Sequence, residues 1–248
     1  MGQTYKRNYL KQVIVRIDFL NPILPLNEQV PLDLSSSIAA LFPIPEPREI
    51  IANELQIRAD STIQQREEKI REWNFHSRER DKFLCITSNC MFISFSVYKS
   101  FEDLQMNFTN ITATLFKVFK DMQIRRLGLR YINNVEIPGG DPLKWSTYLN
   151  KNLISIFNFV ENKKTISRAF HNLELNFGSF NLKLQYGMPN PDFPAPIKKK
   201  IFVLDYDAYY QGFMKEAEMK EGLIVFHEEI QKLFEKSISD KLKVMLNA

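Results

Sequence analysis

The chain has 248 residues, of which 44% are hydrophobic and 12% aromatic, and its formal net charge is +4. This composition is that of a globular protein and excludes a disordered or low-complexity chain. This mild charge is compatible with an acidic partner, but a nucleic-acid-binding domain usually shows a denser basic patch. Cys85 and Cys90 are too few for a disulfide scaffold or a cysteine-based zinc site, so we expect reduced thiols.

The N-terminal region predicts neither a signal peptide nor a membrane span. Arg16 and Asp18 interrupt the apolar run of residues 13–20, and no other segment reaches the apolar length that a membrane helix needs. We therefore expect a cytoplasmic protein without membrane contact.

The first half of the sequence predicts several strands and then a long helix. Residues 13–20 alternate in the manner of a half-buried strand, and a short helix is expected to end near Phe42, before three prolines. Residues 49–58 predict a strand, and the polar run 60–71 predicts either a solvated hairpin or a short helix. Strands on either side of Ser88 and Asn89 predict a hairpin.

A long helix is expected to begin after Ser100, which is a suitable N-cap, and to end near Met122. Its apolar residues recur at spacings of three and four, which places them on one helix face. They are Leu104, Phe108, Ile111, Leu115 and Phe119.

The second half predicts a similar order of elements. It opens on the central strand of residues 124–135, in which Leu127, Leu129 and Tyr131 share one face. The later elements are a helix over 142–159, strands over 168–177, 180–186 and 199–206, and a final helix over 221–239. We therefore predict an α+β protein in which long helices pack on an antiparallel β-sheet. Its halves, 1–123 and 124–248, are predicted to be pseudo-repeats of a β-α-β(n)-α unit, as in helix-grip or TATA-binding-protein-like folds.

Three motifs carry a resemblance to a known family. They are the opening YKRNYLKQVIVRIDF, the central RLGLRYIN and the late LIVFHEEIQKLFEKSIS. Together they resemble a family of sporadically distributed prokaryotic proteins of about 250 residues, which has no established function, over the chain from about Tyr5 to Ser239. The patchy distribution of such a family implies a role in defence or mobile elements. The resemblance supplies no catalytic residues.

Arginines supply the first candidate site. Arg126 and Arg130 share a face of the central strand with Gly128 between them, and Arg16 joins them if the first strands of the two halves pair. A guanidinium group binds two oxygens of a phosphate or carboxylate at once, so such a cluster predicts an anion or nucleic-acid site. The alternative is that these arginines form ion pairs across the sheet with Asp18, Glu54 or Glu174.

Lysines supply the second candidate. Lys198, Lys199 and Lys200, with Lys183 on a neighbouring strand, predict a basic edge that contacts phosphates. The alternative is a charged edge strand that resists aggregation.

Carboxylates supply the third candidate. Asp205 and Asp207 share a strand face, and Glu174 is a potential third oxygen ligand for Mg²⁺. A solvated strand face explains them equally well. His171 alternates with Leu173 and Leu175, which predicts a hydrogen-bonded core histidine rather than a metal ligand.

The sequence contains no Walker loop, no G-x-S-x-G elbow and no dinucleotide-binding fingerprint. We therefore expect a non-enzymatic binding or accessory module without a cofactor, acting on a protein partner or as a homo-oligomer. The alternatives are nucleic-acid or nucleotide binding through the arginines and lysines, and a metal-dependent enzyme that uses Asp205 and Asp207.

Overall fold

The computed structural model describes residues 5–57 and 63–248, with the backbone alone for 52–57 and 63–68. The strands are β1 (Leu10–Phe19), β2 (Ile44–Pro45), β3 (Arg48–Ile57), β4 (Ile63–His76), β5 (Lys82–Ile86), β6 (Cys90–Phe95), β7 (Ile124–Glu136), β8 (Ala169–Asn176), β9 (Asn181–Met188) and β10 (Ile201–Met214). The α-helices are α1 (Leu32–Leu41), α2 (Phe101–Val118), α3 (Lys151–Ile154), α4 (Glu216–Ser237) and α5 (Asp240–Asn247). Short 3₁₀ helices are η1 (Leu24–Asn27), η2 (Ser155–Phe159) and η3 (Lys163–Thr165).

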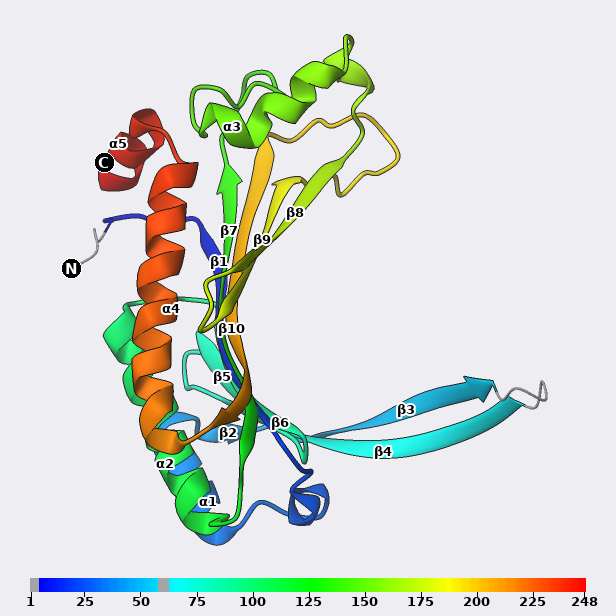
Figure 1. The fold of residues 1–248 in the computed structure, drawn as a ribbon, viewed down its shortest axis with the longest axis vertical. Helices are drawn as coiled ribbons and strands as arrows, with labels where there is room; N and C mark the ends of the chain where they lie inside the picture. Colours follow the sequence, from blue (N-terminus) through cyan, green and yellow to red (C-terminus); the bar gives the residue numbers. More distant parts are fainter. Residues whose placement is uncertain (1–4, 58–62) are drawn as a thin grey trace. The chain divides into compact units, whose positions relative to one another are not determined.

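The described part of the chain is an α+β protein, with five helices packed on one ten-stranded antiparallel sheet (Figure 1). The strand order is β2-β4-β5-β6-β1-β7-β10-β9-β8, and β3 pairs with β4. The predicted α+β class, with helices packed on an antiparallel sheet, is therefore confirmed. Among the described residues, no helix is both long and apolar enough to cross a membrane.

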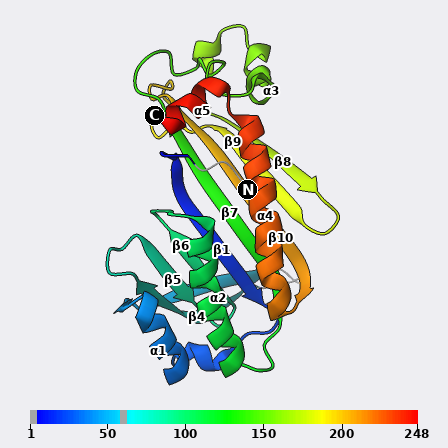
Figure 2. The same cartoon turned by 90° about the vertical axis from the view of Figure 1, so that its left-hand side faces the viewer.

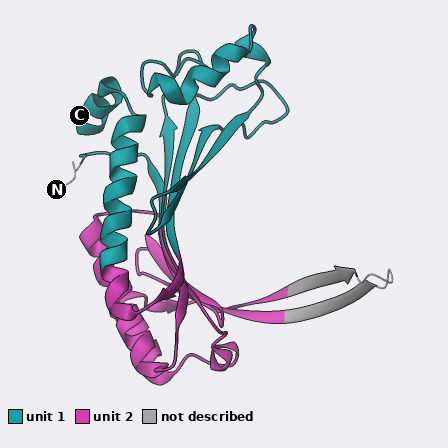
Figure 3. Cartoon of the chain, in the orientation of Figure 1, with its two compact units in different colours: residues 1–13, 128–210, 221–248 teal, residues 14–127, 211–220 magenta. Residues whose placement is uncertain are grey.

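The chain forms two compact units, which Figure 3 colours separately. Unit 1 comprises residues 1–13, 128–210 and 221–248, and unit 2 comprises residues 14–127 and 211–220. The units therefore interleave along the sequence, and neither is one continuous stretch of chain.

In unit 2, helices cover one face of the strands (Figure 2). Val15, Ile17 and Phe19 of β1 are fully or almost fully buried, as the alternation of residues 13–20 predicts. The apolar stripe of α2 is also buried from Leu104 to Leu115. The hydroxyl of Ser100 accepts a hydrogen bond from the backbone N–H of Asp103 at 3.1 Å, which confirms the predicted N-cap.

In unit 1, α4 covers one face of the strands β7, β10, β9 and β8 (Figure 1). The Tyr206 hydroxyl of β10 donates a hydrogen bond to the Ser237 hydroxyl of α4 at 2.7 Å. The rings of Phe180, just before β9, and Phe226, in the middle of α4, lie 5.1 Å apart. Burial of such aromatic side chains contributes roughly 1.5–3 kcal/mol each.

The sequence prediction is wrong for the segment after β7. A helix is expected over residues 142–159, but the structure has turns up to Asn150, followed by the short α3 and η2. The Trp145 side chain is 1% exposed, and its ring lies 5.3 Å from the ring of Phe202. The packing of this ring in the core therefore determines the path of the segment, and the apolar spacing of its residues does not indicate a helix. Asn150 then starts α3 by accepting a hydrogen bond from the N–H of Asn152.

Several element ends also differ from the sequence prediction. The helix α2 ends at Val118, before Met122, and β10 continues well past Tyr206. The polar run 60–71 belongs to a β-hairpin from Ile63 onward, and residues 60–62 lie outside the described residues. Ser239 caps α5, a helix that the apolar pattern of α4 does not predict.

Two glycines of the β8–β9 hairpin provide a matched test of its packing. A side-chain carbon on Gly187 would overlap the carbonyl oxygen of Ala169, whereas a Cβ on Gly178 would meet no atom within 4 Å. Both residues have positive φ, so Gly178→Ala should cost about 1 kcal/mol of unfolding free energy from the backbone alone. We expect Gly187→Ala to cost at least about 2 kcal/mol in urea denaturation, because β8 must also shift. Equal losses for the two variants would contradict this account of the packing.

Both cysteines should be unreactive in the folded protein. Cys85 and Cys90 are buried free thiols, and burial raises the pKa of the Cys85 thiol to about 12. The unfolded chain releases this proton near pH 8.5, so the stability contributed by Cys85 should be lost as pH rises from there towards about 12. A thiol reagent at neutral pH should label both residues slowly before denaturation and rapidly after it. Rapid labelling of the native protein would contradict the burial of Cys85 and Cys90 in the β5–β6 hairpin.

Candidate functional site

The candidate charged residues of unit 1 lie on the sheet face that α4 does not cover. Tyr206 points to α4, and because successive strand residues alternate, Asp205 and Asp207 point to the opposite face. The strand registers place Gln185 beside Asp205 and Lys183 beside Asp207. We call this surface the helix-free face of unit 1.

Arg130 and Asp205 form a two-pronged ion pair on this face. The guanidinium Nε lies 2.8 Å from Asp205 Oδ1, and Nη2 lies 2.6 Å from Oδ2. The Asp205 side chain is 9% exposed and that of Arg130 is 38% exposed. The hydrogen bond to Asp205 is the main cause that raises the pKa of Arg130 above its ordinary value. Arg130 is therefore occupied by a carboxylate of its own sheet.

Lys183 lies between two carboxylates on neighbouring strands. It is opposite Glu174 of β8 and opposite Asp207 of β10 in the two registers. Such directly opposed residues have side chains about 5 Å apart, so opposite charges in one row stabilise the sheet. Glu174 and Asp207 are separated by the whole of β9, hence by about 10 Å, which is too far for a shared metal ligand set.

The predicted metal set of Asp205, Asp207 and Glu174 is thus not assembled. The described parts of the chain contain no group of three or more His, Cys, Asp or Glu side chains that could hold a metal ion. Each of the three carboxylates has a cationic side chain as its neighbour, either Arg130 or Lys183.

The lysine run lies apart from Lys183. Lys198, Lys199 and Lys200 precede β10, and Lys183 lies beside Asp207, about 20 Å further along the strand. The Lys200 ammonium packs over the rings of Trp145 and Tyr148, at 5.6 and 5.1 Å from the ring centres. β10 is also an interior strand between β7 and β9, so the predicted basic edge is not formed.

In unit 2, Arg16 binds the nearly buried carboxylate of Asp18. Their Nε and Oδ1 atoms lie 2.7 Å apart, and the Asp18 side chain is 10% exposed. The two residues are separated by one position on β1 and so lie on the same face. Glu54, another predicted partner for the arginines, lies outside the described side chains.

Asp18 also lines a hollow of about 290 Å³, together with Arg125, Arg126 and Gln211. We call this the arginine hollow; all four residues belong to unit 2. Of the three predicted arginines, the structure thus associates Arg16 and Arg126 with Asp18, whereas Arg130 belongs to unit 1. The hollow has two guanidinium groups, and its one carboxylate is already bound by Arg16.

Sequence reasoning missed Arg125 and Gln211. Arg125 adjoins Arg126 at the start of β7, where strict alternation places it on the other face. Gln211 lies beyond the predicted end of the strand at Tyr206, so no pattern could associate it with the arginines. The tandem Arg125–Arg126 is the signal that could have been used for the first of them.

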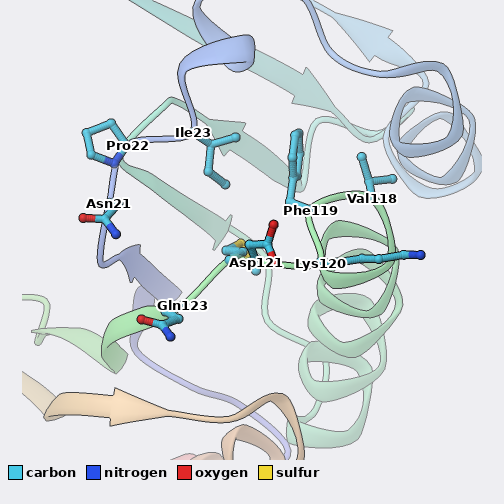
Figure 4. Close-up of a pocket in the computed structure, with 9 residues that line it drawn as sticks. Asn21, Pro22, Ile23, Val118, Phe119, Lys120, Asp121 and Gln123 are labelled. Atoms are coloured by element: carbon cyan, nitrogen blue, oxygen red, sulfur yellow. The ribbon is translucent and has the colours of Figure 1, made fainter.

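A larger hollow of unit 2, of about 470 Å³, lies between residues 21–23 and 118–123 (Figure 4). Its lining combines apolar side chains such as Ile23 and Phe119 with the carboxylate of Asp121. Lys120 points away from the other lining side chains in Figure 4. The lining also includes the amide side chains of Asn21 and Gln123, but a single carboxylate provides neither an acid–base pair nor a metal ligand set.

Each of the three histidines contacts an aromatic or polar side chain. His171 stacks on Tyr186, at 5.0 Å between ring centres, and its buried Nε2 has no hydrogen-bond partner among the described groups. The prediction of a hydrogen-bonded core histidine is therefore not met at Nε2. The Tyr131 hydroxyl lies 3.0 Å from Nδ1 of His227, and His76 lies 3.3 Å from Glu46.

A search against models of protein families finds no match to this chain. A search against curated protein sequences also finds none.

The Arg130–Asp205 pair allows a direct test of the geometry of unit 1. Arg130→Ala leaves a nearly buried carboxylate without its main partner, so the free energy of unfolding should fall by about 1–3 kcal/mol. Because Arg130 is more than one-third exposed, water replaces part of the interaction, and a double-mutant cycle with Asp205→Asn should give a coupling of about 1 kcal/mol. Lys199→Ala, at an exposed position, should change stability by less than about 0.5 kcal/mol. A coupling near zero would show that the pair is not formed in solution.

Proposed function

We propose that this protein is a non-enzymatic binding module that holds an anionic group of its partner in the arginine hollow. The observation that carries the proposal is that Arg125 and Arg126 line one hollow with Asp18, whose charge Arg16 already balances. The lining of the hollow thus brings two guanidinium groups together beside one carboxylate. Guanidinium groups bind carboxylate and phosphate oxygens in pairs, which is the chemistry that an acidic partner offers.

The pairing of the other candidate residues favours a binding role over catalysis. Asp205 is held by Arg130, and a carboxylate in such an ion pair is less available as a metal ligand or as a general base. Glu174 and Asp207 lie on opposite sides of Lys183 in the strand registers, so these two carboxylates do not adjoin. The metal-dependent enzyme is accordingly the less favoured alternative.

The partner that we propose is an acidic protein surface. The hollow is small and lies beside the Arg16–Asp18 ion pair, whose carboxylate is nearly buried, which suits one or two carboxylates better than an extended nucleic-acid backbone. Nucleic acid is the alternative partner, and it would engage the exposed Lys198 and Lys199 in addition to the hollow.

We also propose a family, a cellular role and an internal repeat for this chain. The motif RLGLRYIN supports membership of a sporadically distributed prokaryotic family, and with it a cytoplasmic role in defence or mobile elements. The two halves 1–123 and 124–248 are proposed to descend from one β-α-β(n)-α unit, with a helix-grip or TATA-binding-protein-like arrangement.

Two double variants that remove equal charge test this proposal. The double variant Arg125→Ala, Arg126→Ala alters the hollow, and Lys198→Ala, Lys199→Ala removes two exposed charges of unit 1. A fluorescent glutamate-rich peptide and a fluorescent oligonucleotide are titrated against each protein at low and moderate salt, with anisotropy as the readout. We expect the arginine variant to bind the peptide about tenfold more weakly, because two charge-assisted contacts are lost.

The lysine variant should bind the peptide as the wild type does. If both variants bind alike, or if only the lysine variant is weakened, the arginine hollow is not the binding site. Salt-sensitive oligonucleotide binding that exceeds peptide binding would replace the acidic protein partner with nucleic acid.

A further inference from the structure

The outer edge of β8 is an open sheet edge. β8 is the last strand in the order β7-β10-β9-β8 of unit 1, and among the described residues no backbone hydrogen bond joins it to a segment other than β9. Asn172, Leu173, Glu174 and Asn176 are all exposed. An exposed strand of this length offers unpaired N–H and C=O groups to another strand.

β2 and β8, the two terminal strands of the sheet order, differ in how well they are protected against pairing with a further strand. The edge strand β2 has only two residues, one of them Pro45, and Pro43 and Pro47 flank it. β8 has eight residues, without proline, lysine or arginine, and Leu173 at its centre is 44% exposed. Short strands, prolines and lysines are the usual protections of a sheet edge, and β8 has none of these.

The β8–β9 hairpin determines which backbone groups of β8 point outward. The N–H of Phe177 donates to the carbonyl of Phe180 at 2.9 Å, so this pair closes the hairpin by a hydrogen bond. Hydrogen-bonded and non-hydrogen-bonded pairs alternate in an antiparallel ladder, so the odd-numbered residues of β8 bond to β9. The outward groups therefore belong to Phe170, Asn172, Glu174 and Asn176.

We propose that this edge pairs with the same edge of a second copy of the chain, antiparallel and about a two-fold axis at Leu173. In this register Phe170 faces Asn176 of the other copy and Asn172 faces Glu174, so all the outward-facing backbone groups of both strands bond. A shift by two residues in one direction leaves Asn176 unpaired. A shift in the other direction leaves Phe170 unpaired and sets Glu174 against its own copy, which is unfavourable.

The side chains match in the same register. Leu173 meets Leu173 of the other copy in a non-hydrogen-bonded pair, where facing side chains are closest. On the opposite face the amide of Asn172 reaches the carboxylate of Glu174. The contact is isologous, so it closes at two copies and does not propagate into fibres. Because one pair of strands buries little area, we expect a weak dimer that dissociates on dilution.

This inference does not depend on the arginine hollow, whose residues belong to unit 2. Sedimentation of the full chain across a wide range of concentrations should show a monomer–dimer equilibrium. Leu173→Lys places a charge at the two-fold axis and should abolish the dimer, with an unchanged far-ultraviolet circular dichroism spectrum. Leu32→Lys, at a residue of α1 that is 80% exposed, is the matched control and should not change it.

A cysteine at the same position tests the register. The two Cα atoms of the central pair should lie about 4.5 Å apart, within the range that a disulfide bridges. Leu173→Cys should therefore form a disulfide-linked dimer at least about tenfold faster than Leu32→Cys under mild oxidation, since the paired edges raise its effective concentration. The native Cys85 and Cys90 are buried and should not interfere.

Asn172 gives a second and independent measurement. Asn172→Lys should strengthen the dimer through Glu174 of the other copy, and Asn172→Glu should weaken it by setting two carboxylates together. Equal crosslinking rates for the two cysteine variants, a wild type that stays monomeric, or a dimer that persists in Leu173→Lys would each overturn the proposal. If Leu173→Lys fails to fold, the opposed effects of the Asn172 variants decide the question.

Discussion

The structure depends on the burial of one face of its sheet by helices. In each unit the helices cover one face of the strands, so every second strand residue must be apolar and the residues between must tolerate water. Leu129, Tyr131 and Val135 of β7 are buried by this rule, whereas Arg130 lies on the opposite face. Along each strand, core residues thus alternate with residues that can carry polar side chains.

This arrangement explains why so many charged residues of unit 1 serve the sheet itself. A helix-free face is half-shielded by its neighbouring strands, so a charge there is partly desolvated and gains from a partner within reach. Arg130 with Asp205 satisfies that requirement, and the strand registers place Lys183 opposite Glu174 and Asp207. Arg130, which resembles a site residue in the sequence, is therefore part of a structural pair in the folded chain.

Unit 2 differs in the number of arginines for each carboxylate. Arg16 binds Asp18, and both Arg125 and Arg126 line the same hollow. These two adjacent guanidinium groups make the arginine hollow the stronger candidate for a ligand, while the open backbone of β8 offers a separate contact of a different kind.

The sequence by itself determined the elements with strong local patterns. The alternation of Val13 to Phe19 and the helical stripe of Leu104 to Leu115 correspond to β1 and α2, because burial of one face imposes a period on the chain. Ser100 marks the start of α2, because its hydroxyl caps the helix. Only the tertiary structure decided which strands are neighbours and which charges meet. Asp205 is 75 positions from Arg130, and no local period carries information about that distance or about the placement of Gln211. The helix predicted around Trp145 is wrong for the same reason, because the burial of this ring against Phe202 outweighs the helical preference of its neighbours.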